Sequence, residues 1–185
     1  ISYKILGQYE LALSDYNKAV ERDPEEVDNY ESRADLYALL EENAKAFLDY
    51  SKCIELYPND AYYLNSRGDF HSDIEEYDNA IEDYAKSIEL DPENLEAYIG
   101  RANIHIGLEE YDKALADFAK CIELDPEYPD TYYYRTTIYE NEEEYDLALS
   151  DYNKAVELDP EGVNIYEYRA DLYALLGENS KAFLD

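Results

Sequence analysis

The chain has 185 residues and a formal net charge of −31, from 15 Lys and Arg against 46 Asp and Glu. A chain this acidic repels phosphates, so we expect neither nucleic acid nor an anionic membrane as partner. No apolar run is long enough to span a membrane, so we expect no membrane insertion. Such a charge is typical of disorder, but the aliphatic and aromatic residues fall on helical positions, which favours a folded chain. There is no Met, so we expect a processed or partial chain.

Five Pro residues recur at equal intervals of 34 residues: Pro24, Pro58, Pro92, Pro126 and Pro160. Their neighbours recur as well, for example in KSIELDPE and KCIELDPE. A fixed period of this length with two helical patterns per period is typical of a stacked array of helical hairpins. We therefore predict one all-α solenoid over residues 1–185, in which each layer is stabilised by its neighbours.

Each repeat is numbered here so that its Pro falls at position 32. The chain then reads as a partial repeat at 1–26, full repeats at 27–60, 61–94, 95–128 and 129–162, and a partial repeat at 163–185. Position 20 is always Ala: Ala12, Ala46, Ala80, Ala114, Ala148 and Ala182. Position 24 is always aromatic: Tyr16, Tyr50, Tyr84, Phe118 and Tyr152. Small residues let two helices approach closely, and the rings fill the space between layers.

On these positions the whole chain resembles the tetratricopeptide repeat family. The resemblance implies a right-handed superhelical solenoid of antiparallel helix pairs, with helix A over about positions 2–14 and helix B over about positions 18–31. The family's Gly at position 15 is present only as Gly7 and Gly177. We expect weaker turns in the other repeats.

Two charged positions never vary. Position 7 is Arg33, Arg67, Arg101, Arg135 and Arg169. Position 23 is Asp15, Asp49, Asp83, Asp117, Asp151 and Asp185. An Arg on helix A and an Asp on helix B in each layer predict a series of ion pairs between the helices; the alternative is that both are solvated.

In the resembled family, positions 2, 5, 6 and 9 of helix A line a concave groove that holds extended peptides. The candidate groove residues are therefore Tyr62, Tyr133, Tyr134, Tyr168, Asp35, Asp69, Asn103 and Asp171. An acidic groove with aromatic faces suits a Lys- or Arg-rich segment, a metal cation or stacked sugar rings, and the alternative is a merely wettable surface. The basic set with which family members hold acidic chaperone tails is absent.

No pattern of catalytic or zinc-binding residues is present. His71 and His105 both fall at position 11, an aromatic core position, and we expect them to be core residues rather than a metal pair. Cys53 and Cys121, at position 27 two repeats apart, are expected to be buried and too distant to form a disulfide. We therefore expect no enzyme and no cofactor, although weak calcium binding by surface carboxylates stays open.

A longer period lies above the 34-residue one. Residues 8–25 recur at 144–161, and residues 30–49 recur at 166–185, so four repeats form a larger unit. Neither end has a polar capping helix, which leaves the apolar residues Ile1, Ile5, Leu6, Phe183 and Leu184 without a cover. Another copy is suited to cover them, and head-to-tail contact that does not close gives an open filament.

The favoured prediction from these observations is a structural scaffold that assembles end to end, alone or within a longer array. The alternative is an adaptor that binds a basic or extended peptide in the acidic, Tyr-lined groove. The compartment is left open, extracellular for a fibre and cytoplasmic for an adaptor.

Overall fold

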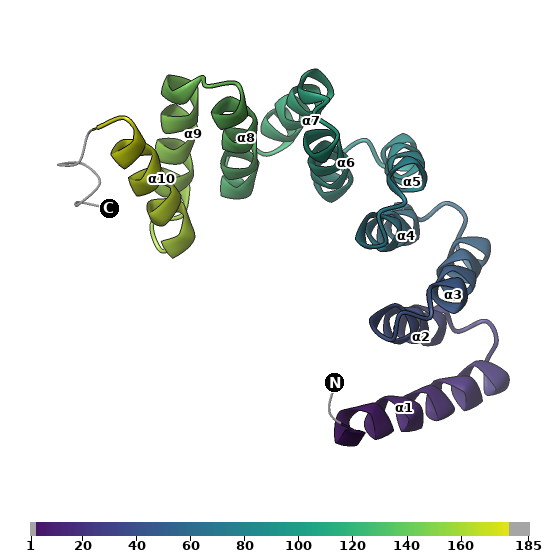
Figure 1. The fold of residues 1–185 in the computed structure, drawn as a ribbon. Helices are drawn as coiled ribbons and strands as arrows, with labels where there is room; N and C mark the ends of the chain where they lie inside the picture. The colour runs from purple at the N-terminus through teal and green to yellow at the C-terminus, as the bar shows by residue number, and fades with distance from the viewer. Residues whose placement is uncertain (1–2, 178–185) are drawn as a thin grey trace. The chain divides into compact units, whose positions relative to one another are not determined.

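The structure, a computed structural model, describes residues 3–177; the side chains of residues 3–6 and of residue 163 lie outside this description. Helices account for all regular structure in that range, which confirms the predicted all-α class (Figure 1). They are α1 (Tyr3–Arg22), α2 (Val27–Leu39), α3 (Asn43–Leu56), α4 (Ala61–Asp73), α5 (Tyr77–Leu90), α6 (Leu95–Gly107), α7 (Tyr111–Leu124), α8 (Pro129–Asn141), α9 (Tyr145–Leu158) and α10 (Val163–Leu175). Among these described helices, none is both long enough and apolar enough to cross a membrane.

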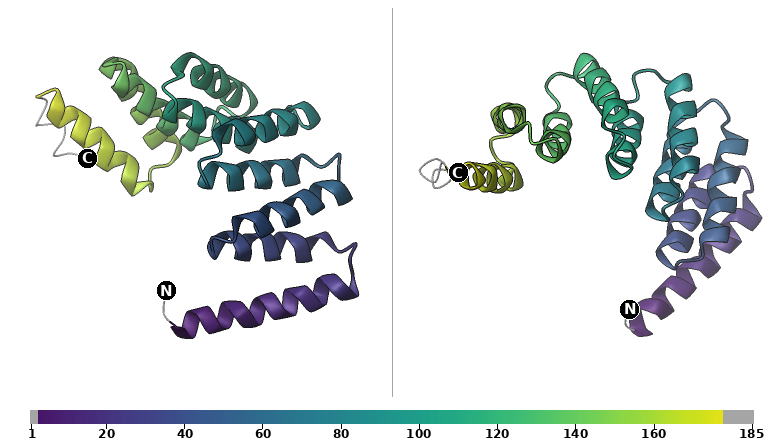
Figure 2. Two further views of the ribbon diagram at one scale, coloured as in Figure 1. Left: turned by 45° about the vertical axis from the view of Figure 1, so that its right-hand side comes forward. Right: turned by 45° about the horizontal axis from the view of Figure 1, so that its top comes forward.

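The chain divides into two compact units, Ile1–Ala97 and Tyr98–Asp185. In the first unit α2 packs on α3 and α4 on α5, and successive helices are stacked from α1 to α5 (Figure 2). In the second unit α8 packs on α9, with α7 against α8 and α10 against α9. A turn too short for a crossover joins each A helix to its B helix, so the two run antiparallel.

The small residues at position 20 make the close contact within each hairpin. Ala46, Ala80, Ala114 and Ala148 are all 0% exposed. The ring at position 24 lies beside them: Tyr50 belongs to a buried cluster with Ala34, Ala46 and Phe70, and Phe118 belongs to one with Ala102, Ala114 and Ile138. Each layer is therefore buried by its own hairpin and by the next repeat, as expected for a solenoid.

Helix bounds in the full repeats lie one residue before the expected ones. In the repeat at 27–60, helix A was expected at about 28–40, and the observed helix, α2, spans Val27–Leu39. Helix B was expected at about 44–57, and the observed helix, α3, spans Asn43–Leu56. A difference of one residue is within the usual uncertainty of helix ends.

The first repeat differs from the prediction. Gly7 occupies the turn position between helices A and B, but it lies inside α1, which continues without a break from Tyr3 to Arg22. Apart from its chain neighbours and the backbone of its own helix, no described atom lies within 4 Å of a Cβ placed on Gly7. Helical hydrogen bonding continues through this Gly, which a helix tolerates at a cost of about 0.5–1 kcal/mol relative to Ala.

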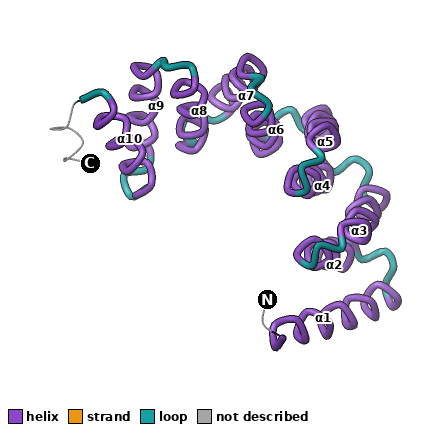
Figure 3. Tube along the Cα trace, in the orientation of Figure 1, coloured by secondary structure: helices purple, strands orange, loops and turns teal. Residues whose placement is uncertain are grey.

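The A-to-B turns of the full repeats are short (Figure 3), and they share one backbone conformation. Position 15 has a positive φ in each of them: 59° at Glu41, 61° at Glu75, 58° at Glu109 and 58° at Glu143. The following residue donates its backbone N–H to a carbonyl five residues earlier, for example Glu110 to His105 at 2.8 Å. This is the hydrogen-bond pattern of a Schellman motif, in which Gly is preferred because a Cβ is disfavoured at positive φ.

Replacing Glu109 with Gly is expected to raise the free energy of unfolding by about 1 kcal/mol, because Gly adopts this conformation without the steric cost. Urea unfolding followed by circular dichroism measures the change. Glu109→Ala is the control, since it removes the charge and keeps the Cβ. Equal stabilisation by Ala and Gly would show that the charge, not the backbone, sets the cost.

Candidate functional site

The predicted ion pairs form in every repeat where the structure describes both partners. Arg33 binds Asp49, Arg67 binds Asp83, Arg101 binds Asp117 and Arg135 binds Asp151, each through two nitrogen–oxygen contacts of 2.6–2.9 Å. The prediction is confirmed for these four pairs, which we call the Arg–Asp ladder. The fifth pair, of Arg169 with Asp185, involves a residue outside the described range.

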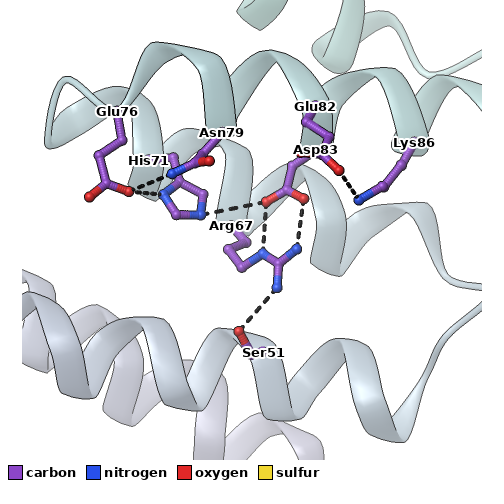
Figure 4. Close-up of polar contacts among 8 residues, drawn as sticks. All are labelled: Ser51, Arg67, His71, Glu76, Asn79, Glu82, Asp83 and Lys86. Carbon is purple, nitrogen blue, oxygen red and sulfur yellow. Dashed lines mark hydrogen bonds and ion pairs between the residues drawn. The ribbon is translucent and has the colours of Figure 1, made fainter.

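The Arg–Asp ladder also joins neighbouring repeats. Arg67 donates from its remaining nitrogen to Ser51 Oγ of the preceding repeat at 3.0 Å (Figure 4), and Arg33 donates to Asn17 Oδ1 in the same way at 2.8 Å. Hydrogen bonding to the partner Asp raises the pKa of Arg33, Arg101 and Arg135 above the ordinary value. These arginines are therefore held in place by the fold.

The two histidines are buried, at 5% and 6% exposure, as expected for core positions. His71 Nδ1 lies 2.9 Å from Glu76 Oε2, and His105 Nδ1 lies 2.7 Å from Glu110 Oε2. Figure 4 shows His71 between Glu76 and Asp83 on α5, with Nε2 3.8 Å from Asp83 Oδ2. Each His connects the end of an A helix to the start of its B helix. Among the described residues, no three His, Cys, Asp or Glu side chains are placed to hold a metal ion.

Two candidate groove aspartates are engaged inside their own hairpins. Tyr50 donates its hydroxyl hydrogen bond to Asp35, and Tyr84 donates to Asp69, both at 2.6 Å. Burial, followed by the hydrogen bond to the carboxylate, raises the pKa of both tyrosines. These hydroxyls stay protonated as donors. In the third full repeat the corresponding residues are Phe118 and Asn103, and Asn103 is exposed.

Three candidate tyrosines come together in the second unit. The ring centroid of Tyr133 lies 5.4 Å from that of Tyr134 and 5.6 Å from that of Tyr168. Tyr168 on α10 is 47% exposed, whereas Tyr133 and Tyr134 on α8 are half-buried. Burial, and then the neighbouring Tyr168, raises the pKa of Tyr133 to about 12. Tyr62 stands in the first unit, 54% exposed, with its ring edge-on to Tyr63 at 5.2 Å.

Hollows open between neighbouring repeats, and three of them are lined by carboxylates without a Lys or Arg; a fourth, of about 200 Å³, is lined by Arg67 and Lys86. The α2–α4 hollow measures about 730 Å³, the α4–α6 hollow about 580 Å³ and the α8–α10 hollow about 360 Å³. Four, four and two carboxylates line them, respectively, and no Lys or Arg does. Their apolar parts come from residues such as Leu39 and Phe70 in the first and Leu172 and Leu175 in the third.

The hollows collect only some of the predicted groove residues. Asp35 lines the α2–α4 hollow, Tyr62 the α4–α6 hollow, and Tyr168 and Asp171 the α8–α10 hollow. Most of the carboxylates that line the α2–α4 and α4–α6 hollows belong to residues that the sequence reasoning did not propose. These are turn and cap residues: Glu41, Asp60, Asp73, Glu75, Asp91 and Glu93. Their positions next to Pro or at helix ends indicated only local turn structure, so no signal in the sequence marked them as lining a shared hollow.

Buried thiols and tyrosines predict a loss of stability at alkaline pH. Burial raises the pKa of Cys53, of Cys121 and of Tyr63 to about 12 each. In the unfolded chain thiols lose their protons near pH 9 and phenols near pH 10, so above pH 9 the unfolded state binds fewer protons than the folded one. Stability is then fully present below pH 9 and falls as the pH rises toward 12.

Urea unfolding at a series of pH values measures this loss. The variant Cys53→Ala/Cys121→Ala, which carries the residue found at this position in two other repeats, is expected to lose less stability between pH 9 and 10. A wild-type midpoint that stays constant up to pH 11 would contradict the assignment.

Comparisons with known proteins agree with the repeat architecture. Sequence profiles of the tetratricopeptide repeat match residues 3–61, 61–94, 95–128 and 131–161. No curated protein sequence matches the chain significantly.

Solved structures share the fold. The crystal structure of MamA is 22% identical, with a TM-score of 0.72 over 87% of this chain and 94% of that one. A tetratricopeptide repeat protein from Parabacteroides merdae is 21% identical, with a TM-score of 0.78 over 98% and 72% of the two chains. YrrB, described as a TPR protein with an unusual peptide-binding site, is 24% identical, with a TM-score of 0.63 over 90% and 86%. These likenesses agree in fold, and the profile matches over most of its length show that the chain belongs to the tetratricopeptide repeat family, a protein-interaction fold.

Proposed function

We propose that the chain is a non-catalytic interaction scaffold that binds a basic, extended segment of a partner protein. The observation that carries the proposal is the lining of the three hollows, where carboxylates stand beside apolar and aromatic side chains without a Lys or Arg among them. Lys and Arg side chains fit such a surface, because their stems cover apolar groups while their charged ends reach carboxylates. The overall charge of −31 also increases the rate at which a basic partner arrives.

The polar contacts described above decide which carboxylates a partner can use. Asp35 and Asp69 already accept hydrogen bonds from Tyr50 and Tyr84, so reversing their charge would disturb the fold as well as the surface. Glu41, Asp73 and Glu75 line the α2–α4 hollow and are exposed. They are the better test residues.

The variant Glu41→Gln/Asp73→Asn/Glu75→Gln is expected to weaken binding of a Lys- and Arg-rich fluorescent peptide by about tenfold or more, at about 0.5–1 kcal/mol per lost charge pair. Fluorescence anisotropy at constant salt measures the affinity. The control Glu10→Gln/Glu21→Gln/Glu89→Gln makes the same change in net charge on exposed positions that line none of the three hollows, and we expect less than a twofold effect. Equal weakening by both variants would show that only the total charge matters, and the proposed site would then be wrong.

End-to-end assembly is the second candidate. It is favoured by the recurrence of residues 8–25 at 144–161 and of residues 30–49 at 166–185, since copies related by this unit continue one lattice. The residues proposed for the contact, Ile1, Phe183 and Leu184, lie outside the described range, as do the side chains of Ile5 and Leu6. Sedimentation at rising concentration tests it: growing elongated particles are expected, and a strict monomer at micromolar concentration would count against it. Weak calcium binding by surface carboxylates likewise stays a proposal.

A further inference from the structure

In the α4–α6 hollow of the first unit, three of the four carboxylates belong to loop residues. It lies where the loop before α4 meets the loop between α5 and α6, and its carboxylates are Asp60, Asp91, Glu93 and Glu96. Asp60 Oδ1 accepts from the Tyr62 backbone N–H and Asp91 Oδ1 from that of Glu93, both at 3.0 Å. These turn hydrogen bonds hold both carboxylates in place and use one oxygen of each, which leaves the second oxygen for a ligand.

A buried amide oxygen in the same hollow lacks a hydrogen-bond partner. Asn65 lines the hollow, is only 7% exposed, and its Oδ1 receives no hydrogen bond. An unpaired buried acceptor costs free energy that a donor entering the hollow would recover. Asn65 is among the residues that line the hollow, so its unpaired acceptor lies next to the space that a ligand would enter. This observation is independent of the carboxylates, and it points to a ligand that donates hydrogen bonds.

We infer that the α4–α6 hollow binds an arginine side chain of the partner segment; the inference rests on the proposed function and names the group that this hollow recognises. A guanidinium has five N–H donors in a planar fork, so it can serve two carboxylates and the Asn65 oxygen at once, which a compact ammonium does less well. The Tyr62 ring and the side chains of Leu90 and Leu95 offer apolar surface for the arginine stem. A metal ion is the weaker occupant, because the described carboxylates do not converge as a metal-binding set.

Chemical-shift titration of the isotopically labelled protein tests the inference with small probes. N-acetyl-arginine amide is expected to shift the Asn65 side-chain amide and the Tyr62 backbone signal in a saturable way. N-acetyl-lysine amide is expected to bind at least about fivefold more weakly, and N-acetyl-citrulline amide, which keeps the shape but not the charge, is expected to cause no saturable shift. Equal effects of citrulline and arginine, or no shift at Asn65, would overturn the inference.

Substitution of Asn65 gives an independent readout. Asn65→Leu removes the unpaired acceptor, so we expect a higher denaturation midpoint together with at least about tenfold weaker binding of the arginine probe. A purely structural Asn would lower the midpoint when replaced. Unchanged binding in a folded variant would overturn the inference.

A matched pair of charge variants tests the inference even if Asn65→Leu is destabilised. Glu93 and Glu127 occupy the same repeat position and each donates its backbone N–H to the Asp two residues earlier, but Glu127 lines none of the three hollows. Glu93→Gln is expected to weaken the arginine probe about threefold or more, and Glu127→Gln to leave it unchanged. Equal effects would overturn the inference. The arginine probe is a single residue, so its binding can be measured separately from that of the basic peptide. If the peptide binds and the probe does not, only this inference is refuted. If the probe binds and the peptide does not, the proposed scaffold function is refuted.

Discussion

Replacing Asp83 with Asn is expected to lower the free energy of unfolding by about 3–5 kcal/mol, the cost of removing one partner from a buried ion pair. The Asp83 side chain is only 4% exposed, and both of its oxygens accept from Arg67 at 2.7 Å. Asn keeps the shape of Asp, but it presents an NH₂ group to the Arg67 guanidinium and leaves the positive charge of Arg67 uncompensated. Because Arg67 also holds Ser51 of the preceding repeat, the loss extends to the neighbouring layer.

The control for this prediction lies one residue away. Glu82 pairs with Lys86 at 2.6 Å, but the two side chains are 65% and 48% exposed. Glu82→Gln is therefore expected to cost less than about 1 kcal/mol. Urea unfolding of both variants measures the two values. If Asp83→Asn lowers the free energy of unfolding no more than Glu82→Gln does, then the Arg–Asp ladder orients the helices without stabilising the fold.

Truncation of Phe118 to Ala is expected to cost about 3–5 kcal/mol, from lost burial and the cavity left behind. The ring is 0% exposed and belongs to the cluster of Ala102, Ala114 and Ile138. Those neighbours lie on α6, α7 and α8, so the ring fills the space between one hairpin and the next helix. Small side chains around it cannot move in far enough to close the gap.

Phe47→Ala is the matched control, since it makes the same substitution on another B helix. Phe47 is 41% exposed and touches His71, with ring centroids 5.7 Å apart. Phe47 buries less apolar surface than Phe118 does, so we expect its truncation to lower the free energy of unfolding by only about 1 kcal/mol. Thermal and urea unfolding compare the two variants. A similar cost at both positions would show that the Phe118 site collapses around the smaller residue.

Much of the fold could be predicted because the pattern is repeated. A 34-residue period with Ala at position 20 and an aromatic ring at position 24 allows one way to bury both faces, and α2–α5 follow it within one residue. The Arg–Asp ladder was predictable for the same reason. Two invariant, opposite charges sixteen residues apart recur in every layer, which favours contact between the helices over two solvated side chains.

Part of the candidate site could not be predicted, since it depends on which side chains already have partners. Asp35 and Asn65 both fall on helix-A positions that the family uses for its groove. In the structure the Asp35 carboxylate is bound by the Tyr50 hydroxyl, whereas the Asn65 oxygen is buried without a donor. Sequence position does not distinguish a satisfied polar group from an unsatisfied one, because the partner comes from another helix.

The amino-acid sequence by itself determined the paired helices of the full repeats and the small and aromatic residues that pack between them. The reason is that burial of a repeated apolar pattern depends on the spacing of its residues. Only the tertiary structure decided that α1 continues through Gly7, that Glu at positive φ is tolerated in four turns, and that turn carboxylates line the hollows. The path of α1 and the turn conformation are set by backbone hydrogen bonds that residue types alone do not specify. The lining of the hollows is set by contacts between different repeats, and no single repeat contains that information.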